Sequence, residues 1–411
     1  MAIRAETKHS MLRRCNGWDY RQRCIYQITL VLADRKSQAL GRLVIPEATA
    51  SCTGLSFDSV LEAAASSYIA LSPAGEAVKR EFWALGEHHP EIKPLEIAIM
   101  PDHIHFIIWV LRPMAKPLGN AIGGFKAGSS KAAIGKGGLW AEGFQDTILF
   151  HEGQLEAMFS YLRDNARRLA VKRLMPDLFR VRRDLRISLK LPLQAQDKGL
   201  PLQVQNLPPS SVPAAVAAGI TGHFSAIGNH FLLESPSLLQ VQCSRSYLAY
   251  LRVPKPGGGL KIARNEKGEP IIEKATPEFE AKRDMLLAAA KHGAVLISPC
   301  ISDGEREIAR LAFAAGLPVI ALRNMGFSPL YKPGGKLFDQ TANGKLLLLA
   351  PAAWSYQTAE KRMTRFDACA LNRIAQLIAG DGAAEINYHG MKPKDIDRLV
   401  REAVKGGPDG Q

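Results

Sequence analysis

The sequence LEIAIMPDHIHFIIWVL, residues 95–111, decides the fold of the first half of the chain. It has the β-branched and aromatic composition of strands, and it is broken at Met100-Pro101-Asp102. Side chains alternate faces along a strand, so His103 and His105 share one face, about 7 Å apart along the backbone. Two imidazoles in this arrangement can converge on one metal ion. Chance is the alternative explanation of the pair, because the chain holds ten histidines.

A helical segment further along the chain adds a tyrosine and an asparagine. Residues 155–172 read LEAMFSYLRDNARRLAVK, in which most of an apolar helical stripe is present and Tyr161 and Asn165 lie at positions i and i+4. A tyrosine hydroxyl can attack a phosphodiester as a covalent nucleophile, and an amide oxygen can complete a metal shell begun by two histidines. Core packing is the alternative role of a tyrosine in such a helix.

Three motifs in this half resemble the single-tyrosine HUH transposases, the insertion-sequence 200/605 and REP-associated class. Residues 100–106, MPDHIHF, resemble the M-P-N-H-V-H-L strand of that family. Residues 161–165, YLRDN, resemble its Y-I-x-x-N helix, and residues 140–144, WAEGF, with Asp146 resemble its W-x-x-x-F-x-D segment. Their order and spacing agree with the family over roughly residues 20–183.

The resemblance implies a ferredoxin-like α+β HUH nuclease domain that cuts and rejoins single-stranded or hairpin DNA, as a homodimer. By position, His103, His105 and Asn165 are the implied metal ligands, and Tyr161 is the implied nucleophile that forms a 5′-phosphotyrosine. The implied cofactor is Mg²⁺ or Mn²⁺. Two histidines favour tighter binding of Mn²⁺, because Mg²⁺ prefers oxygen ligands.

The chain departs from the family pattern at two places. Asp102 stands where the family has an asparagine, and residues 165–169 read NARRL in place of N-P-V-R-A. The second change affects DNA contacts rather than the chemistry. Asp102 and Asp164 are the acidic neighbours of the site and the candidates for a general base.

A run of cations follows the candidate nucleophile. Residues 163–190 contain ten lysines and arginines against three aspartates. Their position favours contacts with DNA phosphates, with a solvated helix face as the alternative. The segment GGFKAGSSK, residues 123–131, is a second candidate for backbone binding. The predicted DNA-binding residues are Lys126, Lys131, Arg163, Arg167, Arg168, Lys172 and Arg173. Candidates for stacking on unpaired bases, with core packing as the alternative, are Trp18, Tyr20, Trp140 and Phe144.

The composition of the whole chain fits a globular protein with a polyanionic partner. Apolar residues make up 46% and charged residues 22%, which excludes a wholly disordered or fibrous chain. The net charge of +14 points to nucleic acid or to a membrane surface. No apolar stretch approaches the roughly 20 residues of a membrane span, and no secretory signal follows the first basic residues. We therefore expect a cytoplasmic protein with no membrane partner.

The second half of the chain predicts a different architecture. Residues 189–213 are rich in Pro, Gln and Leu, which is typical of a linker. Beyond them short apolar runs alternate with helical patterns at 279–291 and 304–315, which predicts an α/β Rossmann-like domain with a parallel sheet. The predicted domains are an HUH transposase-like domain at 20–186, a linker or insertion at 187–220, a Rossmann-like domain at 221–385 and a flexible tail at 386–411.

Two stretches of the second half, residues 224–246 and 294–322, resemble the Rossmann-like domain of DNA-processing A (DprA/Smf) proteins. That domain has a strand ending in S-R and an anion-binding turn before a helix. The residues at those places are Ser244, Arg245, Asp303 and Gly304, which are therefore candidates for anion binding. Asp303 as an N-cap is the alternative. The glycine fingerprints of NAD and ATP sites are missing from the sequence.

Three functions follow from these observations. The first is a metal-dependent enzyme that nicks and transfers single-stranded DNA. The second is a regulator derived from a transposase that binds a DNA or RNA hairpin without cutting it. The third is a nucleotide-processing enzyme in the second half, which the first half directs to DNA by binding it. Dependence on His103 and on metal separates the first from the second, because a pure binder responds to salt instead.

Overall fold

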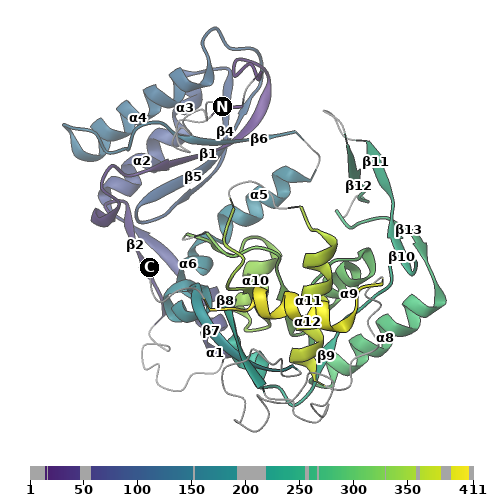
Figure 1. Ribbon diagram of the computed structural model, residues 1–411. Helices are drawn as coiled ribbons and strands as arrows, with labels where there is room; N and C mark the ends of the chain where they lie inside the picture. The colour runs from purple at the N-terminus through teal and green to yellow at the C-terminus, as the bar shows by residue number, and fades with distance from the viewer. Residues whose placement is uncertain are drawn as a thin grey trace, which may run out of the picture. The chain divides into compact units, whose positions relative to one another are not determined.

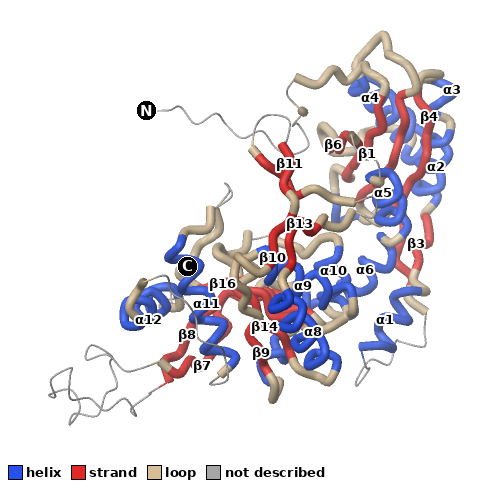
Figure 2. The backbone as a smooth tube through the Cα atoms, turned by 90° about the vertical axis from the view of Figure 1, so that its right-hand side faces the viewer, coloured by secondary structure: helices blue, strands red, loops and turns tan. Residues whose placement is uncertain are grey.

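The computed structural model describes residues 14–15, 17–46, 57–150, 153–191, 219–254, 259–265, 268–328, 330–357, 362–380 and 390–406. The protein is a mixed α/β chain with several sheets (Figures 1 and 2). It divides into two compact units, Met1–Leu174 and Met175–Gln411, which we call the first and second units.

The first unit is built on a four-stranded antiparallel sheet with the strand order β4-β5-β1-β6. Its strands are β1 (Cys24–Val31), β4 (Ile92–Ile99), β5 (His103–Val110) and β6 (Gln145–Leu149). Helices α2 (Pro73–Trp83) and α4 (Leu118–Ile134) pack against each other and against one face of this sheet (Figure 1). The main elements therefore follow the chain order β1-α2-β4-β5-α4-β6, and the break predicted at Met100-Pro101-Asp102 is the turn between β4 and β5.

Alternation along the strands separates a core face from a polar face of the sheet. The core face packs on α2 and α4 and includes Tyr26, Ile28, Leu30, Ile104, Phe106 and Ile108. The opposite face carries Gln27, Thr29, His103 and His105. Helix α5 (Gln154–Arg163) packs over β4 and β5.

Local sequence explains where α2 begins. Ser72 is its N-cap, and the Ser72 hydroxyl accepts a hydrogen bond from the backbone N–H of Gly75 at 3.1 Å. Pro73 occupies the first helical position, where a missing N–H costs nothing. The remaining elements of the unit are η2 (Arg35–Ser37), α1 (Phe57–Ala65), α3 (Leu85–His88) and the paired strands β2 (Gly41–Val44) and β3 (Tyr68–Leu71).

The helical segment predicted over residues 155–172 is two helices. Helix α5 ends at Arg163 and α6 (Asn165–Leu174) begins two residues later, with Asp164 between them. The two helices pack on different partners: α5 contacts β4 and β5, whereas α6 contacts α1, β2 and β3. Tyr161 and Asn165 therefore belong to different helices.

The second unit contains a six-stranded sheet with the order β7-β8-β16-β15-β14-β9. Its strands are β7 (Arg182–Lys190), β8 (Gly219–Gly228), β9 (Leu238–Gln240), β14 (Val295–Ser298), β15 (Val319–Leu322) and β16 (Leu346–Pro351). The last four in this list are parallel to one another, whereas β8 and β7 extend the sheet in antiparallel fashion. The parallel part follows the predicted runs, and the antiparallel part was not predicted.

Helices cover both faces of this sheet. One face packs on α8 (Pro277–Lys291), α9 (Asp303–Ala314) and α10 (Lys336–Ala342). The other packs on α11 (Arg365–Ala379) and α12 (Pro393–Ala403), which lie beside β7 and β8 in Figure 2. Residues 393–403 were expected to be part of a flexible tail. They form a helix instead, because Ile396, Val400 and Val404 recur every four residues and are buried.

The end predicted for the first domain, residue 186, falls inside β7. That strand pairs with β8 and so belongs to the sheet of the second unit. Most of the predicted linker, 192–218, lies outside the described residues. Smaller elements of the second unit are η4 (Pro176–Phe179), η5 (His230–Glu234) and the paired strands β10 (Leu248–Tyr250) with β13 (Ile272–Ala275) and β11 (Arg252–Pro254) with β12 (Leu260–Ile262). Among the helices of the described ranges, none is both long and apolar enough to cross a membrane.

Candidate functional site: a histidine pair beside a tyrosine

His103 and His105 lie side by side on the polar face of β5. Their ring centroids are 4.8 Å apart and their planes are inclined by 81°. The structure thus brings together the two imidazoles that the strand period places on one face.

The Nδ1 atom of His105 faces β1. It lies 2.8 Å from Oγ1 of Thr29 and 3.2 Å from Nε2 of Gln27. Thr29 is the residue directly opposite His105 in the ladder between β1 and β5. Burial, followed by the nearby charge of His103, lowers the pKa of His105 to about 3, so this ring is neutral at neutral pH.

The Nδ1 atom of His103 is held by a carboxylate. It lies 2.6 Å from Oδ1 of Asp102, and Oδ2 of Asp102 forms an ion pair with Arg35 at 2.6 Å. Burial alone would raise the pKa of Asp102, but the hydrogen bond and charge of His103 together with Arg35 lower it to about 2. Asp102 is therefore a positioning group for His103 and a weak base.

Both histidines thus use Nδ1 to contact the protein. Within the described part of the chain, no hydrogen bond occupies Nε2 of either ring. Metal-binding histidines typically donate one ring N–H to a carboxylate, a backbone carbonyl or water and present the other nitrogen to the ion, and His103 follows this pattern.

Tyr161 is the third member of this cluster. Its ring centroid lies 5.7 Å from that of His105, with the planes inclined by 63°. The residue is 37% exposed, and the guanidinium of Arg168 lies 5.6 Å from the ring centroid. The Tyr161 side chain is thus partly exposed and lies beside His105.

The third implied ligand, Asn165, lies at the break between α5 and α6. It is buried at the start of α6, and its side-chain amide donates to the carbonyl of Leu162 at 3.4 Å. Among the described residues, no hydrogen bond joins Asn165 to His103 or His105. Nor does the described chain contain a group of three or more His, Cys, Asp and Glu side chains able to hold a metal ion. Among the three implied ligands, the contact that the structure records is the one between the rings of His103 and His105.

The predicted DNA-binding arginines near Tyr161 have carboxylate partners. Arg163 forms an ion pair with Glu96 at 3.1 Å. Arg167 and Arg168 both contact Asp164, with Nη2 of Arg167 2.9 Å from Oδ2. Asp164 is thus engaged by two guanidinium groups. Lys172 and Arg173 lie in the last turn of α6, where cations are favoured by the helix dipole.

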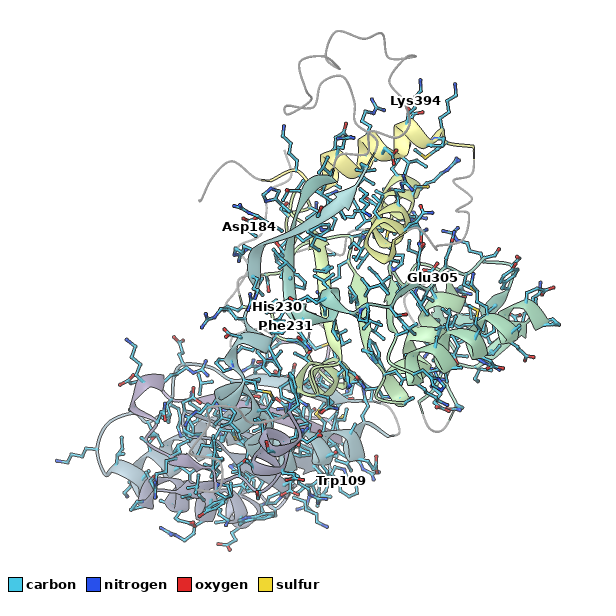
Figure 3. The ribbon with its side chains drawn as sticks, turned by 90° about the horizontal axis from the view of Figure 1, so that it is seen from below. Trp109, Asp184, His230, Phe231, Glu305 and Lys394 are labelled. Carbon is cyan, nitrogen blue, oxygen red and sulfur yellow. The ribbon has the colours of Figure 1, made fainter. Side chains whose placement is uncertain are left out.

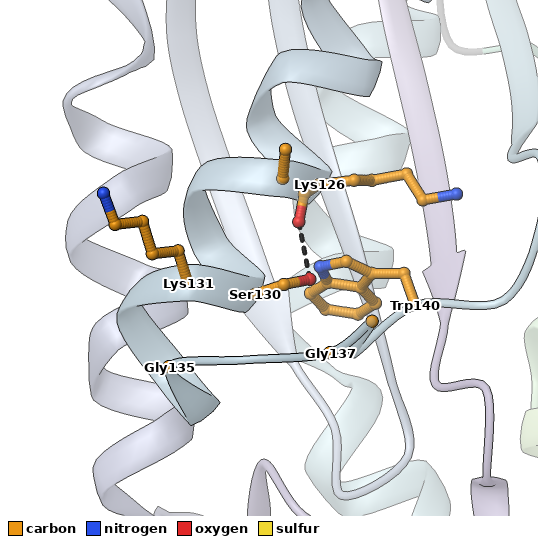
Figure 4. A pocket seen from close by; sticks show the side chains of 8 residues that line it. Lys126, Ser130, Lys131, Gly135, Gly137 and Trp140 are labelled. Atoms are coloured by element: carbon orange, nitrogen blue, oxygen red, sulfur yellow. Dashed lines mark hydrogen bonds between the residues drawn. The ribbon is translucent and has the colours of Figure 1, made fainter.

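Lys126 and Lys131 flank a pocket of about 340 Å³ at the end of α4 (Figure 4). The ammonium group of Lys126 donates to the carbonyls of Ala141 and Gly143 at 2.6 and 3.1 Å, so it ties down the following loop. Burial lowers its pKa. Lys131 is exposed, and Figure 4 shows the two lysines pointing away from each other.

The serines of the GGFKAGSSK segment serve the same structure. The Ser130 hydroxyl donates to the carbonyl of Lys126 at 2.7 Å and accepts from the backbone N–H of Leu139 at 3.1 Å. Ser129 accepts from the indole N–H of Trp140 at 2.9 Å. These bonds fix the loop that follows α4 instead of leaving the hydroxyls for a phosphate.

The aromatic candidates for base stacking belong to the core or pack on it. Trp140 and Phe144 are only 7% and 5% exposed. Trp18 and Tyr20 pack against the same core, and the Tyr20 hydroxyl donates to Asp146 at 2.8 Å. Trp140 and Phe144 therefore have the alternative role of core packing.

In the second unit, Asp303 is engaged by protein groups. Nη2 of Arg252 donates to both of its carboxylate oxygens, at 2.7 and 3.0 Å, and the carboxylate also accepts from the backbone N–H of Tyr250 at 3.2 Å. Gly304 lies against Cys243, since a Cβ built there would sit 2.4 Å from the Cys243 sulfur. Asp303 thus binds protein groups, and Gly304 allows the close packing of Cys243.

The beginning of α9 already holds a carboxylate. Its N-cap is Ser302, and Glu305 completes a capping box while accepting from the backbone N–H of Ile301 at 2.7 Å. A buried carboxylate occupies the position that an external anion would need. The expected anion site at Asp303 and Gly304 is therefore not supported, whereas Ser244 and Arg245 are exposed on the loop after β9.

Sequence reasoning missed the residues that orient the histidines. Thr29, Gln27 and Arg35 lie about 70 to 80 positions before the histidines in the chain. The alternation of β1 places Gln27 and Thr29 on one face, but only the pairing of β1 with β5 shows that His105 lies on that face.

Two solved structures are similar to part of the chain. One is described as a REP-associated tyrosine transposase bound to a REP hairpin, with 12% identity and a TM-score of 0.25 over 38% of this chain and 72% of that chain. The other is a putative transposase from Deinococcus radiodurans, with 12% identity and a TM-score of 0.20 over 38% of this chain and 98% of that chain. No family model and no curated protein matches the sequence.

Proposed function

We propose that the protein is a metal-dependent enzyme that nicks single-stranded or hairpin DNA and transfers the cut strand through a phosphotyrosine at Tyr161. The observation that carries this proposal is the cluster of His103, His105 and Tyr161, in which both histidines turn Nδ1 to the protein and the tyrosine ring lies 5.7 Å from His105. The order β1-α2-β4-β5-α4-β6, with sheet order β4-β5-β1-β6, supports the ferredoxin-like fold implied by the sequence resemblance.

The two histidines fit a divalent cation. His105 is neutral at neutral pH, and His103 is oriented by a carboxylate, so both Nε2 atoms are suited to coordination. Imidazole ligands favour Mn²⁺ over Mg²⁺. When bound, such an ion neutralises charge on a scissile phosphate. Oxygens of water and of the DNA itself would complete its shell, because the described residues offer no third His, Cys, Asp or Glu beside the pair.

The tyrosine performs the bond exchange. Its hydroxyl oxygen attacks the phosphorus, a tyrosine–phosphate bond forms, and the bond to the 3′ oxygen breaks. The phenolic proton ends on that oxygen, which leaves as a 3′-hydroxyl, and the 5′ end stays on the protein. Attack by another 3′-hydroxyl reverses the step and rejoins the strand, because the phosphodiester energy is retained in the covalent intermediate.

Covalent trapping tests this proposal. The wild-type protein is incubated with Mn²⁺ and single-stranded hairpin DNAs that carry a label at the 3′ end, since the fragment joined to tyrosine retains that end. We expect a labelled band at the size of the protein after denaturing electrophoresis. The band should disappear in Tyr161→Phe and with a chelator.

Tyr68→Phe is the matched control, because Tyr68 is an exposed tyrosine of the same unit at 54% exposure. His103→Ala and His105→Ala should reduce the adduct at least tenfold while leaving DNA binding measurable. If no hairpin gives an adduct, and binding is indifferent to His103→Ala, the proposal is wrong and a non-cleaving hairpin-binding regulator becomes the better description.

A further inference from the structure

The outer strands of the second unit's sheet have one apolar and one polar face. Leu185, Ile187 and Leu189 of β7 pack in the core formed with α11 and α12. The side chains between them in β7 lie on the opposite face of the sheet. The β8 residues paired with these side chains lie on that face too. We call this set the β7–β8 polar face: Arg186, Ser188, Lys190, Thr221 and His223.

Two of the five residues of this surface, Arg186 and Lys190, are cations, and further cations lie around them in the chain. Residues 176–191 contain five lysines and arginines against two aspartates. The Arg186 side chain is 69% exposed. Asp184, one of the two aspartates, accepts from Arg186 at 3.0 Å and is hydrogen-bonded to Nδ1 of His223. Asp184 therefore holds Arg186 and His223 in place across the two strands, and Figure 3 shows it on the β7–β8 side of the unit.

A pair of aromatic rings lies beyond the end of β8. The rings of His230 and Phe231 are 4.2 Å apart between centroids and inclined by 31°, and Phe231 is 62% exposed. Asn229 fixes the turn that presents them: its side chain accepts from the backbone N–H of Phe231 at 3.1 Å and donates to the carbonyl of Gly344 at 2.9 Å.

The basic strand and the ring pair are neighbours. Arg182, the first residue of β7, pairs with Ala226 near the end of β8, four residues before His230. Burial, and then the charge of Arg182, lowers the pKa of His230, which places that cation close to the rings. Figure 3 shows His230 and Phe231 on the same side of the unit as Asp184.

Charge on an edge strand also prevents unwanted pairing with other chains. That role explains Arg186 and Lys190, but it does not explain a ring pair held in place and open to solvent at the end of the same ladder. Cations that follow a strand, next to exposed rings, are the combination that binds unpaired nucleotides: the cations contact phosphates and the rings stack on bases. A duplex hides its base faces from such rings.

We propose that the β7–β8 polar face and the His230–Phe231 ring pair form a binding surface for single-stranded DNA, separate from the Tyr161 site. At about 3.3 Å per residue, nine residues of β7 give a track of roughly 26 Å, enough for several nucleotides. The surface binds DNA without a metal and without the tyrosine hydroxyl.

Fluorescence anisotropy of the full-length protein tests this surface. The probe is a labelled oligothymidylate of about 20 nucleotides, titrated over a series of salt concentrations with a chelator present. In the double variant Arg186→Gln, Lys190→Gln, we expect the slope of log K against log salt to fall by about 1.4, because each phosphate contact to a single strand contributes about 0.7.

Phe231→Leu should weaken binding by about fivefold or more without changing the salt slope, since it removes stacking rather than charge. Lys394→Gln is the matched control for loss of an exposed cation, on α12 and labelled in Figure 3. It should leave both affinity and slope unchanged.

Wild-type affinity and slope in the double variant and in Phe231→Leu would overturn the proposal. So would an equal loss in Lys394→Gln, because it would show a response to net charge alone. If the variants lose affinity only for oligouridylate, the ligand is RNA and the assignment to DNA is wrong. The adduct assay for Tyr161 is independent of these anisotropy measurements. If no adduct forms, the binding data still decide whether this surface binds DNA.

Discussion

Thr29 determines which nitrogen of His105 faces away from the sheet. Its hydroxyl lies 2.8 Å from Nδ1, so Nε2 is the atom left for coordination. Groups that orient metal ligands in this way typically contribute a factor of 10 to 100 in metal affinity.

Thr29→Val should therefore weaken Mn²⁺ binding by about tenfold, because valine keeps the shape of the side chain and removes only the hydroxyl. Isothermal titration of Mn²⁺ measures this directly. Thr147→Val, at an exposed threonine of β6, is the control and should bind as wild type. Equal affinity of all three proteins would mean that His105 does not bind metal through Nε2.

At the residue scale, the sequence predicts positions on a strand but not the partners across it. His103 and His105 share a face because side chains alternate, and this follows from two residues alone. The partnership of Thr29 with His105 depends on the register between β1 and β5, which no local pattern encodes. The partners of Lys126 are likewise not predictable from local sequence, because its hydrogen bonds to Ala141 and Gly143 depend on how the following loop packs back on α4.

Gly304 is a packing residue in this structure. A Cβ at this position would lie 2.4 Å from the sulfur and 3.1 Å from the Cβ of Cys243. Gly304→Ala should destabilise the second unit by about 1–3 kcal/mol, the usual cost of overpacking. Differential scanning calorimetry measures the shift.

Cys243→Ala in the same protein should restore part of that loss, because it removes the closest atom. Gly334→Ala, where an added Cβ meets nothing within 4 Å, is the control. If Gly304→Ala melts at the wild-type temperature, the close approach to Cys243 is wrong. Anion binding would then be the explanation for a glycine at position 304.

At the element scale, the start of α9 depends on a buried carboxylate. Burial raises the pKa of Glu305 above its ordinary value of 4.5, although backbone N–H groups oppose the shift. The folded state therefore holds the proton more tightly than the unfolded state. It follows that stability contributed by Glu305 is greatest at low pH and declines as the pH rises through the raised pKa.

Glu305→Gln should remove this pH dependence, because glutamine keeps one acceptor oxygen and does not ionise. Hydrogen exchange of a peptide covering α9, compared between the two proteins at each pH, is the measurement. We expect the protection of the wild type relative to Glu305→Gln to fall from pH 4 to pH 8. A constant difference over that range contradicts the raised pKa.

Elements with a strong local signal follow the sequence closely. Helix α2 starts directly after Ser72, and a serine followed by a proline is a typical sequence for the start of a helix. The break between α5 and α6 was missed, because Asp164 keeps helical dihedral angles and the sequence shows no proline or glycine there. The break follows from packing: the two helices rest on different elements.

At the scale of the whole molecule, the tyrosine and histidines of the cluster belong to one chain. Tyr161 lies beside its own His105 in the first unit. A homodimer stays a prediction of the family resemblance, and the proposed chemistry needs no residue from a second copy.

Mixing two inactive variants tests this arrangement. A protein with His103→Ala and His105→Ala is combined with a Tyr161→Phe protein, and the labelled adduct is measured as above. We expect the mixture to form no more adduct than the two proteins do separately. Recovery of adduct on mixing would show that the tyrosine of one chain serves the histidines of another.

The sequence predicts only part of the second unit's sheet. A parallel sheet in the second half follows from its alternating runs, but the assignment of β7 to that sheet could not be predicted, because its partner β8 follows after a long intervening segment. Helix α12 has a local sequence signal, the recurrence of Ile396, Val400 and Val404. The polar, glycine-rich residues that follow it led to the expectation of a flexible tail instead.

The irregular pairing of β7 with β8 also bears on how this surface tolerates changes in chain length. Arg182 is aligned with Ala226 and Leu185 with Phe224, so two residues of β7 stand opposite one of β8. Deleting Arg183 would leave an evenly matched ladder with every leucine still turned inward. Deleting Ser188, only five positions later, would instead rotate the remainder of the strand by half a turn and push its leucines into water. Related sequences that are shorter here should have lost their residue at 183 or 184 and kept the spacing from 185 onward.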